Sequence, residues 1–106
     1  MIFITGPLYS GKRQYARNFC GDGDMITEVQ DLAARCADLP ALADDLARRY
    51  KLIIATEIGG GIVPVDEGQR EARDKAGRLS CMLAERAETV VRIFCGLPMV
   101  LKGDLP

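Results

Sequence analysis

The sequence of 106 residues contains no histidine. Without an imidazole, the chain offers no Ser-His or Cys-His nucleophile pair, no histidine metal ligand and no histidine general base. It also lacks any C-x-x-C pair, because its four cysteines lie far apart: Cys20, Cys36, Cys81 and Cys95. This spacing indicates neither a zinc knuckle nor a redox motif, and we expect the four cysteines to be small core residues.

An excess of charge of one sign is also missing. Fourteen Lys and Arg against fifteen Asp and Glu leave a formal net charge of −1, so no bulk field attracts nucleic acid or anionic lipid. No apolar run is long enough to span a membrane, and the start lacks the basic and long apolar regions of a secretory signal. We therefore expect a cytoplasmic protein without nucleic-acid or membrane partners, in which any phosphate binding is local.

The length of the chain limits the number of domains and the size of the core. A chain of 106 residues predicts a single domain over residues 1–106, at the small end of what buries a good core alone. We therefore expect a homo-oligomer.

Apolar runs and helical periodicity alternate along the chain. Strands are expected at 1–5, 51–56 and 89–95, with a weaker one at 25–29 and a short one after Gly96. Helices are expected at 12–20, at 31–50 in two pieces divided at Pro40, and from Asp66 to about Glu88. Gly77 inside the last helix suggests close packing there. The alternation predicts an α/β fold of the P-loop type, with a doubly wound, mainly parallel sheet and helices on both faces.

The stretch GPLYSGKR follows the first strand and matches the phosphate-binding pattern G-x-x-x-x-G-K-[ST] except at its last position. In such a loop, backbone N–H groups surround a phosphate and the lysine reaches its β and γ oxygens. The predicted nucleotide-binding residues are Gly6, Ser10, Gly11, Lys12 and Arg13, and Lys12 is also the predicted catalytic cation. The alternative is a tight strand–helix turn without a ligand.

Two residues of the predicted site leave alternatives open. Arg13 replaces the hydroxyl that normally binds magnesium, and a guanidinium has only donors. It either supplies a positive charge in place of the metal or points to solvent. Glu57 directly follows the strand KLIIAT, at its carboxyl end, so it is the predicted catalytic carboxylate and Mg²⁺ ligand, or else a solvated loop residue. Asp24 and Glu28, near the weaker strand, are poorer candidates.

With these residues in view, the chain resembles the bifunctional adenosylcobinamide kinase and adenosylcobinamide-phosphate guanylyltransferase family of cobalamin biosynthesis. The family's loop ending S-G-K-S is similar to Ser10, Gly11 and Lys12, and its N-E-V-G-x-G-I-V-P is similar to TEIGGGIVP, which begins at Thr56. Its R-x-F-R-D-x-x-G is similar to REARDKAG, and its A-G-L-P-L-x-L-K is similar to CGLPMVLK. The likeness covers residues 1–17 and 52–103.

The resemblance implies a P-loop fold, ATP or GTP as nucleotide, a corrinoid substrate and a homotrimer with sites between subunits. Family members are longer and use a histidine to carry the guanylyl group, which this sequence lacks. It therefore implies a shortened member that works, if active, as an ATP/GTP-dependent adenosylcobinamide kinase. The alternatives are a non-catalytic nucleotide- or corrinoid-binding regulatory or assembly protein, and a structural oligomer that binds nothing at this edge.

Overall fold

The computed structural model describes residues 1–58 and 66–105. Its elements, in chain order, are β1 (Ile2–Gly6), α1 (Lys12–Ala16), the 3-10 helix η1 (Asp22–Asp24), β2 (Met25–Ile26), α2 (Val29–Ala34), α3 (Leu39–Arg49), β3 (Leu52–Thr56), α4 (Glu67–Arg86), β4 (Thr89–Phe94) and β5 (Leu97–Lys102). The family-like segment Gly59 to Pro64 falls outside the described residues.

The strands form one sheet in the order β2-β3-β1-β4-β5. β1 runs parallel to β3 and β4, and β2 runs parallel to β3. β5 pairs antiparallel with β4. The order places the carboxyl ends of β3, β1 and β4 next to one another, where ligands bind in such sheets.

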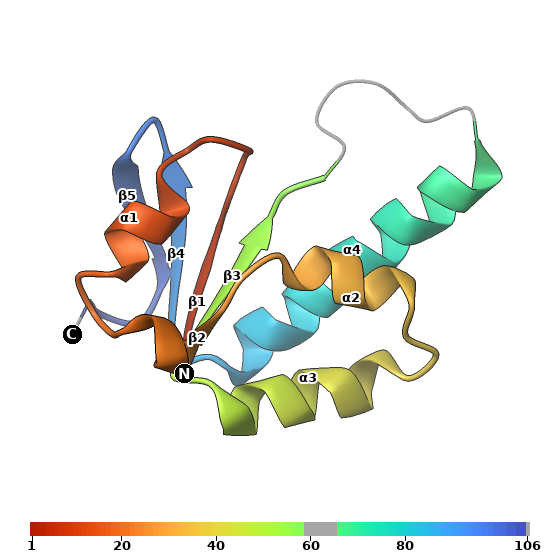
Figure 1. Ribbon diagram of the computed structural model, residues 1–106, viewed down its shortest axis with the longest axis horizontal. Helices are drawn as coiled ribbons and strands as arrows, with labels where there is room; N and C mark the ends of the chain where they lie inside the picture. Colours follow the sequence, from red (N-terminus) through yellow and green to blue (C-terminus); the bar gives the residue numbers. More distant parts are fainter. Residues whose placement is uncertain (59–65, 106) are drawn as a thin grey trace.

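Helices cover both faces of the sheet, as the sequence predicts. On one face Ile4, Ile54 and Val91 pack with Ala16 of α1. On the other, the alternate residues of the same strands pack with helices α2, α3 and α4. Figure 1 shows α2, α3 and α4 grouped together and apart from α1. The α/β, mainly parallel fold class is therefore confirmed.

Local capping explains where the two long helices begin. Asp38 accepts a hydrogen bond from Ala41 N at 3.1 Å, and Pro40 lies in the first turn of α3, where its missing N–H costs nothing. Asp66 accepts from Gly68 N at 3.0 Å ahead of α4. Within the described ranges, no helix is both long and apolar enough to cross a bilayer.

Two elements are shorter than the sequence predicts. α1 ends at Ala16 rather than Cys20, since Asn18 N and Phe19 N donate to carbonyls three residues back and tighten the last turn. β2 ends at Ile26, and Val29 begins α2 instead of continuing a strand. Because β2 ends at Ile26, the residues after it already lie at the carboxyl edge of the sheet.

Two packing expectations are wrong. A Cβ atom on Gly77 would meet nothing within 4 Å, so this glycine marks open space and not close packing. Cys81 and Cys95 are exposed, on the outer side of α4 and in the β4–β5 turn, while Cys20 and Cys36 are partly buried. All four are free thiols.

Candidate functional site

The loop between β1 and α1 lies tightly against the neighbouring strand. A Cβ atom on Gly6 would lie 2.3 Å from Ile93 O, so only glycine allows this approach. Gly11 has a φ of 92°, in the left-handed region, where it begins α1. Gly96 N donates to Ser10 O at 2.8 Å, and Glu57 N donates to Gly6 O at 2.9 Å. The loop is therefore anchored to the segments that follow β3 and β4.

Lys12 is a buried cation inside this loop. Its side chain is only 7% exposed, and its Nζ donates to Pro7 O at 2.7 Å. Burial lowers the pKa of Lys12 below its usual value, while the negative charges of Glu28 and Glu57 act in the opposite direction. Among the described residues, no carboxylate lies within ion-pair distance of Lys12. Its charge is therefore available for an anionic ligand.

A cavity of about 340 Å³ opens beside Lys12 and brings several predicted residues together. It is lined by Ser10, Gly11, Lys12 and Arg13. Gly6 does not line it and instead packs against the backbone of Ile93 at the start of the loop. Ser10 is 5% exposed, and its hydroxyl has no hydrogen-bond partner in the part of the chain that the structure describes. A buried hydroxyl without a partner is costly, and a bound ligand would satisfy it.

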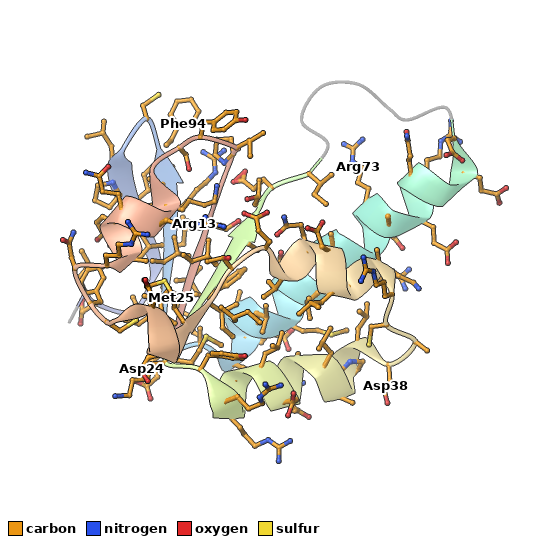
Figure 2. All side chains as sticks on the ribbon, viewed as in Figure 1. Arg13, Asp24, Met25, Asp38, Arg73 and Phe94 are labelled. Atoms are coloured by element: carbon orange, nitrogen blue, oxygen red, sulfur yellow. The ribbon has the colours of Figure 1, made fainter. Side chains whose placement is uncertain are left out.

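Glu28 also lines this cavity, although the sequence made it a poorer candidate. Its φ is 58°, and it accepts hydrogen bonds from Thr56 Oγ1 at 3.3 Å and from Gln30 Nε2. The orientation follows from the left-handed backbone after a two-residue strand, which periodicity does not reveal. The available signal was its place in or beside the weaker strand expected at 25–29. Asp24 lies before β2, at the opposite end of the sheet from Phe94 (Figure 2).

Arg13 bridges α1 and the segment after β2. Its Nη2 donates to Thr27 Oγ1 at 3.2 Å, at an exposed position. Arg13 thus lies at the mouth of the cavity and is directed toward Thr27. Figure 2 shows it on the opposite side of the strands from Arg73 of α4.

Glu57 lies in a different place from the Lys12 cavity. Its carboxylate binds Arg92 through two nitrogens, with Nε–Oε2 at 2.9 Å and Nη2–Oε1 at 3.0 Å. The hydrogen bond to Glu57 raises the pKa of Arg92 above its usual value. Glu57 lines a groove of about 640 Å³ between the sheet and α4, together with Phe94 and Gly77.

The groove and the cavity lie on opposite faces of the sheet. Arg92 and Phe94 alternate with Val91 and Ile93, which face α1. Ile54, which lines the cavity, also faces α1. Glu57 and Glu28 thus line different spaces, although Thr56 lines both and the charge of Glu57 still acts on Lys12. Across residues 1–58 and 66–105, no three or more Asp, Glu or Cys side chains gather where they would hold one metal ion.

Comparison with known proteins points to one family. The family model described as cobinamide kinase / cobinamide phosphate guanyltransferase matches residues 22–101. The bifunctional adenosylcobalamin biosynthesis protein CobP of Pseudomonas aeruginosa is 43% identical over 53 residues, which cover 50% of this chain and 31% of that protein. The corresponding CobU proteins of Escherichia coli and Salmonella typhimurium are 33% identical over 75 residues, covering 71% of this chain and 37% of each relative. The matched parts thus span about a third of these relatives.

Proposed function

The chain belongs to the cobinamide kinase / cobinamide phosphate guanyltransferase family of cobalamin biosynthesis, and from that premise we propose that it binds ATP or GTP and phosphorylates a corrinoid. The observation that carries the nucleotide site is Lys12, buried in the loop beside a cavity and without a carboxylate partner. Family membership supplies the acceptor class, since the family name specifies a cobinamide kinase. The guanyltransferase half is left out because the sequence has no histidine to carry a guanylyl group.

In the proposed complex, Lys12 exchanges its bond to Pro7 O for oxygens of the β and γ phosphates. The N–H groups of Gly11, Lys12 and Arg13, at the start of α1, have no partner within that helix and are suited to the same anion. Phosphoryl transfer depends mainly on such positioning and charge stabilisation. Ser10 and Gly6 keep the loop in the curled form that brings these donors together.

Magnesium fits this site only as an ion carried by the triphosphate. Arg13 has no lone pair to offer, and Mg²⁺ at phosphoryl-transfer sites commonly takes one or two carboxylates besides the phosphates. The ion, when bound, supplies neutralisation of the phosphate charge. Our proposal for its carboxylate is Glu57, which has to leave Arg92 to take this role.

A second candidate is a non-catalytic nucleotide- or corrinoid-binding protein that regulates or assembles with other cobalamin enzymes. Arg13 favours it, because this side chain removes the usual magnesium hydroxyl and is directed toward Thr27. This reading predicts binding without turnover.

We further propose that the chain acts as one P-loop-type domain in a cytoplasmic homotrimer, with sites between subunits. The apolar side chains of the edge strand β5 support association, since Leu97, Val100 and Leu101 are exposed at 68%, 45% and 61%.

Titration calorimetry with ATP and GTP, with and without Mg²⁺, tests the nucleotide site. Lys12→Ala should weaken binding about 100-fold, because it removes the buried cation from the phosphates. Lys51→Ala is the matched control, since that lysine is exposed and lies ahead of β3. The proposal fails if the wild-type chain binds no nucleotide at about millimolar concentration or if Lys12→Ala binds equally well.

Incubation with cobinamide, Mg²⁺ and ATP or GTP then separates the two candidates. Phosphorylated cobinamide supports the kinase, whereas tight binding without product supports the binding protein. Glu57→Gln should raise the Mg²⁺ concentration needed for half-maximal activity about tenfold. An unchanged requirement would remove Glu57 from the proposed site.

A further inference from the structure

Strained backbone gathers at the carboxyl end of the sheet. Among the described residues, the non-glycine residues with positive φ are Tyr9, Glu28 and Cys95, and they follow β1, β2 and β4 respectively. A left-handed conformation costs a non-glycine residue roughly 1 kcal/mol, so it persists only where the surroundings impose it. Tyr9 and Glu28 both line the Lys12 cavity, and of the three residues Glu28 supplies a carboxylate to it.

Donors from two elements hold the Glu28 carboxylate. Thr56 Oγ1 donates to it from the end of β3, and Gln30 Nε2 donates from α2. Gln30 is itself only 6% exposed and accepts a hydrogen bond from Thr56 N at 3.0 Å. These hydrogen bonds fix the orientation of the Glu28 carboxylate. That orientation therefore depends on how β2, α2 and β3 meet.

Glu28 and Lys12 line the same cavity without forming an ion pair. The negative charge of Glu28 opposes the lowering of the Lys12 pKa more than the charge of Glu57 does. The cavity between them is large enough to admit reacting groups, and the buried Ser10 hydroxyl in its wall has no partner among the described residues. Lys12, a cation that can bind phosphate, and Glu28, a carboxylate that can accept a proton, therefore line the same cavity.

We propose that Glu28 accepts the proton of the hydroxyl that is phosphorylated, an inference that rests on the proposed kinase function. The acceptor oxygen forms a bond to the γ-phosphorus while the bond from that phosphorus to the β–γ bridging oxygen breaks. The nucleoside diphosphate leaves with the electron pair, and the hydroxyl proton passes to a Glu28 carboxylate oxygen. Glu57 is not suited to this step, because it is ion-paired with the Arg92 cation, whereas the donors to Glu28 are the neutral side chains of Thr56 and Gln30.

The test compares Glu28→Gln with the matched control Asp31→Asn, which removes an exposed carboxylate three residues away. Product formation from cobinamide, ATP or GTP and Mg²⁺ is measured alongside nucleotide affinity by calorimetry. We expect Glu28→Gln to lower kcat by about 10²- to 10⁴-fold, with nucleotide Kd changed less than about threefold. Asp31→Asn should leave both values within about twofold of the wild type.

A second variant distinguishes loss of the proton acceptor from misfolding of the chain. Glu28→Asp keeps a carboxylate and tolerates the left-handed backbone, but it withdraws the oxygens by one methylene. Its kcat should lie between those of the wild type and Glu28→Gln, with a thermal unfolding temperature close to that of the wild type. A Glu28→Asp variant as inactive as Glu28→Gln and equally poor in nucleotide binding would assign Glu28 a purely structural role and overturn the inference.

The remaining outcomes separate this inference from the function on which it rests. If the wild type phosphorylates cobinamide and Glu28→Gln does so within about threefold of its rate, the inference is wrong and the kinase proposal stands. If the wild type binds nucleotide but forms no product, both the kinase proposal and the proton-acceptor role are overturned.

Discussion

Two cations lie near the carboxyl end of the sheet, and their surroundings differ. Arg92, in the groove on the α4 face, is held by both oxygens of Glu57. Lys12, beside the cavity on the α1 face, donates to the backbone carbonyl of Pro7 and has no ion-pair partner among residues 1–58 and 66–105. A cation that is already ion-paired gains little from a phosphate, whereas a buried cation without an ion-pair partner gains a great deal. The difference supports our proposal that the anion binds in the Lys12 cavity rather than in the larger groove.

The carboxylates show the same contrast. Glu57 follows a five-residue strand and is engaged in an ion pair, while Glu28 follows a two-residue strand and lines the same cavity as Lys12. A clear strand pattern in the sequence therefore does not predict which carboxylate lines the Lys12 cavity. Cavity volume is a poor guide as well, since the groove of about 640 Å³ is the larger of the two.

Gly6→Ala should disturb both regions at once and have the largest effect. The added Cβ would collide with Ile93 O, and the Gly6 carbonyl also anchors Glu57 N. Overpacking against backbone together with a strained φ should lower the free energy of unfolding by about 3 kcal/mol. Urea unfolding measures the effect, with Gly23→Ala as control because a Cβ there meets nothing. Equal stability of the two variants would show that the loop does not need this close approach.

Gly77→Ala should change the groove and leave the Lys12 cavity unchanged, so it tests whether the two regions are independent. The added methyl enters open space in an exposed stretch of α4, so helix propensity should raise the stability by about 1 kcal/mol. For a chain of this size, the unfolding temperature should rise by about 4–8 °C. Nucleotide affinity should stay the same, since the cavity lies on the other face. A clear loss of nucleotide binding in calorimetry would mean that the two regions are coupled.

Lys12→Met should change how stability depends on pH, which is the smallest of these effects. Burial places the folded-state pKa of Lys12 below its usual 10.5, so between these values the unfolded chain binds more protons than the folded one. The wild type should therefore gain stability relative to Lys12→Met as the pH rises through that window.

Urea unfolding of both proteins between neutral pH and about pH 10.5 measures this difference. Lys51→Met, at an exposed lysine, supplies the control for general pH effects. Parallel pH curves for the wild type and Lys12→Met would indicate that the ammonium is as well solvated in the fold as in the unfolded chain.

Much of the fold was predictable because its causes are local. Continuous apolar runs predicted β1, β3 and β4, and Asp66 and Pro40 marked the beginnings of α4 and α3. The strand–loop–helix arrangement around GPLYSGKR was predictable too, since the strand, the glycines and the helix are adjacent in the chain. The prediction failed where local signals were weak or misleading, as at β2, at the end of α1, at Gly77 and at Cys81 and Cys95.

By itself, then, the sequence determined the α/β class, the strands of the parallel core and the presence of a loop with Lys12, because these depend on periodicity and turn chemistry over a few residues. Only the tertiary structure decided that Glu28 lines the same cavity as Lys12 while Glu57 pairs with Arg92. Those relations depend on the strand order β2-β3-β1-β4-β5 and on which face each side chain takes. Such contacts join residues far apart in the chain, and no local pattern encodes them.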